Sequence, residues 1–253
     1  MYAFFTRYFW ILVLCSTSVL AQNQNDIESE ETTEVVQDTL IFKQKYGLRV
    51  GIDLSKIVRS FLDDNYTGLE LIGDYRITDR LYLAGEIGNE TRTLQTDFLD
   101  NTTKGTYFKA GVDMNFYQNW LDMQNMIFGG FRIGASSFNQ TLNSFTIYDV
   151  NNTYFGQYSD DTIQSFEGLT ALWAEIIIGI KAELFNNFFA GINTQIKFLL
   201  ADKAPDNFEN LYIPGFNRTY DSSAFGAGYS FTLSYMVPIF KKDKIVIQER
   251  ETE

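Results

Sequence analysis

Apolar and polar residues alternate with the period of a β-strand in eight segments of this chain. The clearest is Lys45–Ser55, where even-numbered positions are apolar and odd-numbered positions are glycine or polar. The other seven are Gly68–Ile77, Leu81–Gly88, Thr106–Tyr117, Met126–Ser136, Leu172–Leu184, Phe188–Leu200 and Ala224–Phe240. A sheet with one apolar and one charged face keeps its backbone polar groups paired inside lipid when it closes into a barrel. The pattern therefore predicts an all-β fold, an eight-stranded antiparallel transmembrane β-barrel with up-and-down connections. Pro238 has no N–H to donate and is expected at the fraying end of the last strand.

The connections between these segments alternate between short and long. They are short after the second, fourth and sixth segments and long after the others, which matches barrels with short periplasmic turns and long external loops. We therefore expect the barrel over residues 45–240, in a bacterial outer membrane with both termini periplasmic, and a periplasmic tail over 241–253. Residues 144–150 and 153–158 are too short to span a bilayer and are interpreted as a hairpin in the third loop.

The first 44 residues have a different composition. Residues 1–21 contain Arg7 and an apolar run from Tyr8 to Cys15, which is far shorter than the roughly 20 residues of a spanning helix. This is typical of a cleaved signal peptide. Residues 22–44 contain six acidic side chains and Lys43 as the only basic one, and they are expected to form a periplasmic linker.

Composition narrows the chemistry further. The chain has no histidine, and its one cysteine would leave with the signal peptide, so the usual general base, zinc ligand and thiol nucleophile are missing. We expect no enzyme activity, no cofactor and no metal site. One loop contains oxygen ligands whose spacing matches no calcium motif: Asp202, Asp206, Asn207, Glu209 and Asn210. A net charge of −12 without a basic face excludes nucleic acid as a partner.

The inward positions of the predicted strands hold six positive and seven negative side chains. With Asp53, they are Arg49, Glu70, Asp74, Arg76, Glu86, Lys109, Asp113, Arg132, Glu175, Lys181, Glu183 and Lys197. Eight strands enclose only enough space for their own side chains, and buried charges need partners. The near balance of charge therefore predicts a lumen ion-pair network, with a proton or ion path as the alternative.

The fourth long loop is rich in aromatic residues. Tyr212, Phe216, Arg218 and Tyr220 form a candidate interaction site, because these residue types concentrate binding energy at interfaces. The same side chains would also suit a lid over the barrel mouth. Gly226 and Gly228 on the next strand leave room for rings to fold inward, which favours the lid.

Three stretches carry a resemblance to a known family. They are YGLRVGIDLSK at Tyr46–Lys56, GLTALWAEIIIGIK at Gly168–Lys181 and DNFENLYIPGFNRTYD at Asp206–Asp221. Over about Lys45–Phe240 the chain resembles the domain of unknown function 6048 family of Gram-negative outer-membrane proteins. The resemblance implies an outer-membrane barrel of unassigned activity.

Taken together, these patterns indicate a structural or accessory outer-membrane barrel. We expect its partners to be membrane lipid and other envelope proteins that it docks, for example within a transport or barrel-assembly complex. The alternative is a surface-exposed binder of a small or glycan ligand.

Overall fold

Eight long strands make up most of the protein. The computed structural model describes residues 36–117, 119, 123–147, 157–219 and 223–250, and residues Ile41–Ile245 form the compact unit considered below. The long strands are β1 (Val36–Asp53), β2 (Tyr66–Arg76), β3 (Leu81–Gln95), β4 (Leu99–Asn115), β5 (Met126–Ile147), β7 (Gln164–Phe185), β8 (Phe188–Asp202) and β11 (Phe225–Arg250). The short elements are the helix α2 (Leu54–Leu62) and the strands β6 (Tyr158–Asp160), β9 (Tyr212–Ile213) and β10 (Asn217–Arg218).

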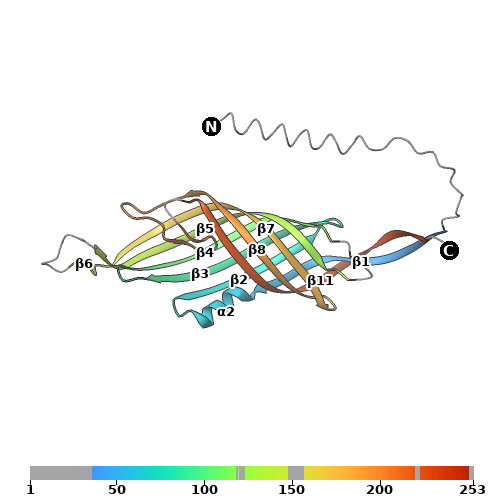
Figure 1. Ribbon diagram of the computed structural model, residues 1–253, viewed down its shortest axis with the longest axis horizontal. Helices are drawn as coiled ribbons and strands as arrows, with labels where there is room; N and C mark the ends of the chain where they lie inside the picture. The colour runs from blue at the N-terminus through green and yellow to red at the C-terminus, as the bar shows by residue number, and fades with distance from the viewer. Residues whose placement is uncertain (1–35, 118, 120–122, 148–156, 220–222, 251–253) are drawn as a thin grey trace, which may run out of the picture. The chain divides into compact units, whose positions relative to one another are not determined.

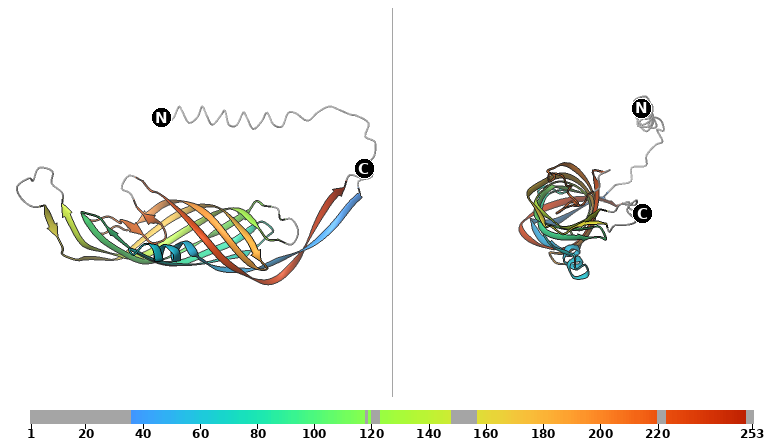
Figure 2. Two further views of the ribbon diagram at one scale, coloured as in Figure 1. Left: turned by 60° about the horizontal axis from the view of Figure 1, so that its bottom comes forward. Right: turned by 90° about the vertical axis from the view of Figure 1, so that its left-hand side faces the viewer.

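The eight long strands close into a ring (Figures 1 and 2). Their order is β4-β3-β2-β1-β11-β8-β7-β5, and a further pairing between β4 and β5 completes the circle. Each long strand therefore lies beside its neighbours in the chain, as in an up-and-down barrel. The predicted eight-stranded antiparallel barrel is confirmed. No described helix is long and apolar enough to cross a membrane.

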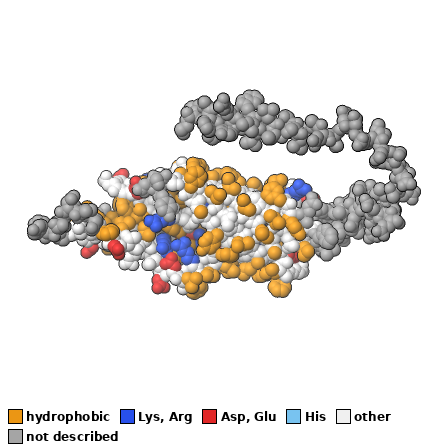
Figure 3. All heavy atoms as spheres, viewed as in Figure 1, with side chains coloured by type: hydrophobic (Ala, Val, Ile, Leu, Met, Phe, Trp, Pro, Cys, Tyr) orange, Lys and Arg blue, Asp and Glu red, His pale blue; other side chains and the backbone are white. Residues whose placement is uncertain are grey.

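The alternation of the sequence places side chains on the two faces of the wall. On β2, Leu69 and Leu71 are 50% and 48% exposed. On the opposite face of the same strand, Glu70 and Asp74 are only 2% and 6% exposed. The same alternation continues around the ring, so that hydrophobic side chains cover the outer wall (Figure 3). Apolar groups face outward and charges face inward, which is the arrangement of a transmembrane barrel.

Several strands are longer than the sequence pattern predicts. One end of the barrel carries α2 and residues 203–219, and we call it the loop end; the other carries the β2–β3 and β7–β8 turns, and we call it the turn end. β5 and β7 each have 22 residues, about twice the roughly 9–11 needed to cross a bilayer. Their extra residues continue the sheet beyond the loop end. The expected hairpin of the third loop is described only in part, as Phe145–Ile147 paired with β6.

The first predicted strand ends earlier than expected. Lys45–Ser55 was predicted as strand, but β1 ends at Asp53 and α2 follows. The Asp53 carboxylate accepts a hydrogen bond of 2.8 Å from Ser55 N–H, which caps the helix. The apolar side chains of α2 recur at helical spacing, which the β interpretation did not accommodate.

The ends of β1 and β11 also differ from expectation. β1 begins at Val36, inside the expected linker 22–44, and β11 continues to Arg250, inside the expected tail 241–253. Pro238 therefore lies within β11 rather than at its end. Met236 N–H donates to Asn187 O, just before the start of β8. The backbone nitrogen of Pro238, two residues further on, points to the same side but lies past the start of β8. The missing N–H of Pro238 therefore costs the sheet no hydrogen bond. The expected signal peptide, residues 1–21, lies outside the described residues.

Candidate functional site

Lys109 lies at the centre of the charged lumen. Its Nζ is 2.5 Å from Glu86 Oε2, 3.3 Å from Glu70 Oε2 and 3.9 Å from Glu175 Oε2. The four side chains come from β4, β3, β2 and β7, so this contact joins strands on different sides of the ring. Lys109 is 2% exposed, and a buried ammonium without such partners would be strongly destabilising.

Two further cations extend this cluster. Arg132 Nη2 is 2.8 Å from Asp113 Oδ1, and Arg132 Nε is 3.4 Å from Glu86 Oε1. Lys197 Nζ is 3.6 Å from Glu175 Oε1. Seven of the predicted network residues are thereby brought together in one chain of ion pairs.

A second, smaller group lies nearer the turn end. Asp74 accepts one hydrogen bond of 2.6 Å from Arg49 Nε and another of 2.6 Å from Lys181 Nζ. The Arg49 guanidinium also lies 4.8 Å from the ring centroid of Tyr82 and 5.1 Å from that of Phe189. Three more of the predicted network residues are therefore paired here, between β1, β2 and β7.

Arg76 and Glu183 are not part of either group. Arg76 donates to the carbonyl oxygens of Thr78 and Asp79 in the β2–β3 turn, and its nearest carboxylate contact is 4.0 Å, to Asp79. Glu183 accepts from the backbone N–H groups of Gln124 and Asn187. Both were predicted as members of the lumen network, but they lie where the strands end, and their polar atoms hold the turns instead.

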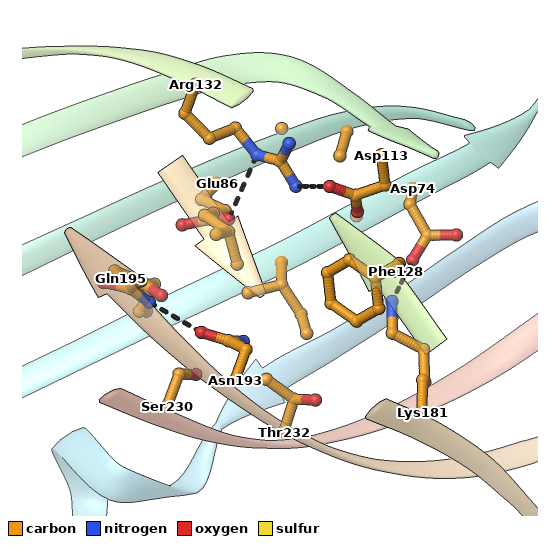
Figure 4. A pocket seen from close by; sticks show the side chains of 16 residues that line it. Asp74, Glu86, Asp113, Phe128, Arg132, Lys181, Asn193, Gln195, Ser230 and Thr232 are labelled. Carbon is orange, nitrogen blue, oxygen red and sulfur yellow. Dashed lines mark hydrogen bonds and ion pairs between the residues drawn. The ribbon is translucent and has the colours of Figure 1, made fainter. Parts of the chain in front are cut away.

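Little space remains between the charged groups. A cavity of about 30 Å³ lies between the two ion-pair groups, where Asp74, Glu86, Arg132 and Lys181 approach one another (Figure 4). A volume of this size holds roughly two water molecules. Gln195 and Asn193 close its opposite side with a mutual hydrogen bond of 2.9 Å. The lumen is therefore packed with side chains at this level.

This packing gives an expectation for ion conduction. The purified protein in planar lipid bilayers should show no steady conductance above the leak of the bilayer, because the paired charges leave no continuous aqueous path. Steady, large current steps from the wild-type protein would contradict a packed lumen.

The fourth long loop folds into the barrel at the loop end. Tyr212, Ile213 and Phe216 are 5%, 0% and 1% exposed. Phe216 and Ile213 belong to a buried apolar cluster that also contains Tyr107, Phe138, Leu169, Ala171 and Trp173. The rings of Phe216 and Trp173 meet edge to face with centroids 6.1 Å apart. We call residues 211–219 the loop plug.

Gly215 lets the loop plug approach the wall. Its φ is +82°, and a Cβ atom there would lie 2.6 Å from Cγ of Tyr107. Its carbonyl oxygen accepts a hydrogen bond of 2.6 Å from Lys197 Nζ. A glycine is required here for both the backbone conformation and the close contact. The lumen charges thus bind the loop plug as well as one another.

The sequence reasoning missed Glu90. This carboxylate is 0% exposed and accepts hydrogen bonds from Tyr66 Oη at 3.0 Å, Tyr212 Oη at 2.7 Å and Gly215 N–H at 3.0 Å, and it also pairs with Lys56 of α2. The predicted third strand ended at Gly88. The inward positions of β3 continue at the same spacing to residue 90, which was the signal available.

The remaining loop residues have different positions. Arg218 is exposed on β10, and Tyr220 lies outside the described residues. Asn210 of the acidic segment donates its side-chain amide to Asp202 at 2.7 Å. Within the described residues, no group of three or more histidine, cysteine or acidic side chains is arranged to hold a metal ion.

Comparison with known proteins gives a family. No curated protein matches the chain. One solved structure that the chain resembles is Ail, the attachment invasion locus protein of Yersinia pestis, with 9% sequence identity, a TM-score of 0.38, and coverage of 77% of this chain and 99% of that chain. The family model described as a domain of unknown function, DUF6048, matches residues 1–242. The chain therefore belongs to the DUF6048 family.

Proposed function

We propose that this protein is an accessory barrel of the bacterial outer membrane that docks another envelope protein at its loop end. The proposal assigns it no reaction. It rests mainly on the sheet that β4, β5, β6 and β7 form beyond the loop end. Strands longer than a membrane requires serve no spanning purpose, and an added sheet offers backbone and side chains for contact with a partner.

The closed lumen supports the same proposal. The ion pairs around Lys109 and the loop plug occupy the interior, so transport through this barrel is not its role. We therefore assign its function in the envelope to contacts made by its outer surfaces. We place both termini in the periplasm and the loop end outside the cell, following the alternation of turn lengths.

The outer part of the extended sheet has the features of a contact surface. Among the described strands, β6 is the last of the sheet and lies at its edge. Ile147, Tyr158 and Ile163 nearby are 55%, 60% and 68% exposed. An exposed strand edge beside apolar side chains suits the addition of a partner strand.

Co-purification tests this surface. The double substitution Tyr158→Glu with Ile163→Glu should lower the yield of a stoichiometric partner by about tenfold or more after extraction in mild detergent, because two charges would be buried at the contact. Met123→Glu places the same change at an exposed site of the turn end and should leave the yield unchanged. Heat-modifiable migration on a gel reports whether each variant retains its barrel.

Two results would contradict the proposal. One is a wild-type barrel that purifies without any stoichiometric partner, which would favour a surface binder of a small or glycan ligand. The other is a partner that stays bound to the double variant. Protease added to intact cells would separately contradict the orientation if it removed residues 22–44 and left residues 137–170 intact.

A further inference from the structure

Within the described part of the chain, the barrel wall lacks strand pairing near the loop end, between β2 and β11. β1 ends at Asp53, while β2 and β11 continue beside it as Tyr66–Glu70 and Phe225–Ser230. At this end of β1, Phe231 N–H on β11 donates to the Asp53 carboxylate at 3.2 Å. Among the described strands, β2 and β11 are not paired with each other. Two strand edges therefore flank a gap in the wall.

The helix α2 covers this gap from outside the ring (Figure 2). Its Ser60 Oγ accepts a hydrogen bond of 2.8 Å from Gly68 N–H on the free edge of β2. On the other edge, the side-chain amide of Asn217 donates to Ala227 O at 3.0 Å. Side chains thus replace part of the missing backbone ladder, which lowers the cost of two open edges inside a membrane.

Lys56 attaches the helix to the interior. It extends from α2 to Glu90 on the lumen face of β3 and pairs with that carboxylate. Its Nζ lies 5.9 Å from the ring centroid of Tyr107. An ion pair that passes through the gap therefore holds the helix in place. The outer side of the helix is not required to attach it to the barrel.

A groove runs between α2 and β11 on the outer side of the wall. Its volume is about 400 Å³, within the range of about 300–1,000 Å³ typical of ligand sites. Seven residues line it: Leu54, Ser55, Val58, Arg59, Leu62, Tyr229 and Phe231. Leu62 and Tyr229 are 82% and 62% exposed, so the lining is apolar and open. Tyr229 and Phe231 belong to the outward face of β11, the face that meets lipid.

One cation lies among the lining residues. The Arg59 guanidinium lies 4.0 Å from the ring centroid of Tyr66 and 3.7 Å from the Asp63 carboxylate. Asp63 is also paired with Arg92. One carboxylate is shared by two guanidinium groups, so Arg59, Asp63 and Arg92 together carry a charge of +1 at the edge of an apolar groove, with the exposed Asp64 beside them in the chain.

We propose that the groove between α2 and β11 binds an acyl chain of a diacyl phospholipid from the surrounding membrane, with the lipid phosphate held by Arg59. The groove opens on the lipid-facing wall, so a lipid reaches it without crossing water. Its apolar lining matches an acyl chain, and the guanidinium of Arg59 on the lining matches a phosphate. A diacyl lipid can place one chain in the groove and leave the other in the bilayer.

Native mass spectrometry of the purified full chain tests the apolar part of the site. Extracted in mild detergent with added phosphatidylglycerol, the wild-type protein should retain a bound lipid. Val58→Trp fills the groove and should reduce retention by about tenfold or more. Ile178→Trp adds the same ring to an exposed position of the lipid-facing wall on β7, which β8 separates from β11 and the groove, and should leave retention unchanged. Val58 is 51% exposed, so neither change disturbs the core, and heat-modifiable migration verifies the barrel.

A competition experiment tests the role of Arg59. The wild-type protein should prefer phosphatidylglycerol to a diacylglycerol with the same chains, which lacks the phosphate. Arg59→Gln should remove this preference and keep binding of the chain. Equal retention by the wild type and Val58→Trp would overturn the proposal, as would an unchanged preference in Arg59→Gln or displacement of phosphatidylglycerol by lipid A.

Discussion

Replacing Lys109 with methionine should lower the free energy of unfolding by roughly 3–5 kcal/mol, the cost of removing one partner of a buried ion pair. Methionine preserves most of the side-chain volume, so the effect comes from charge. The variant would leave the carboxylates of Glu70, Glu86 and Glu175 close together without the ammonium group between them. Glu86 would still pair with Arg132, and Glu175 would still pair with Lys197. Urea unfolding of the refolded protein in detergent, followed by heat-modifiable migration, measures the change.

Lys104 provides the matched control for this experiment. It lies on the same strand, β4, but its side chain is exposed. Lys104→Met should therefore change stability by no more than about 0.5 kcal/mol, as is usual for surface positions. A Lys109→Met variant as stable as Lys104→Met would mean that water solvates the three carboxylates, and the packed lumen would be wrong.

The central network shows what strand periodicity can predict. In a barrel, alternate residues must face the lumen, and neighbouring strands bring inward residues to similar depth. Lys109 lies opposite Glu86 in the β3–β4 register, and Arg132 lies opposite Glu175 in the β5–β7 register. A sequence pattern fixes the face of each charge. It does not fix its partner, because long side chains reach across the ring to strands that are not neighbours.

The extensions of the strands were not predictable from the same pattern. Alternation between apolar and polar residues arises only where one face meets lipid. Beyond the membrane both faces of the sheet meet water or the loop plug, as in Leu99–Thr103 of β4 and Asn139–Ile147 of β5, and the apolar half of the signal is lost. Glu90 was missed for this reason, since it lies past the last lipid-facing residue of the predicted third strand.

The helix α2 carried a signal that the strand interpretation concealed. Leu54, Ile57, Val58, Phe61 and Leu62 recur at the spacing of one helical face, after an aspartate that favours helix N-termini. The apolar–polar alternation that predicts the first strand continues without interruption to Leu54. The same leucine is also the first apolar residue of the helical pattern, so the sequence alone does not show where the strand ends. The structure resolves the conflict at Asp53, whose side chain caps the helix.

The two interpretations of the fourth loop give opposite outcomes for Phe216→Ala. The side chain is 1% exposed and packs on Trp173, and a Cβ on Gly226 would lie 3.1 Å from its ring. Truncating so enclosed a phenylalanine removes its burial and leaves a cavity, with a typical cost of about 3–5 kcal/mol. We therefore expect a large loss of thermal stability and unchanged co-purification of any partner. A docking residue would instead lose the partner and keep the stability.

Arg218→Ala separates packing in the loop plug from contact at its surface. Arg218 is exposed and lies two residues from Phe216 on the same loop, so the loss of its contacts should cost no more than about 1 kcal/mol, as is usual for exposed charged groups. If Phe216→Ala were as stable as Arg218→Ala, the ring would not support the barrel mouth. If Arg218→Ala alone released a partner, the loop would have two roles. Its buried side, with Phe216, would fill the barrel mouth, and its exposed side, with Arg218, would bind the partner.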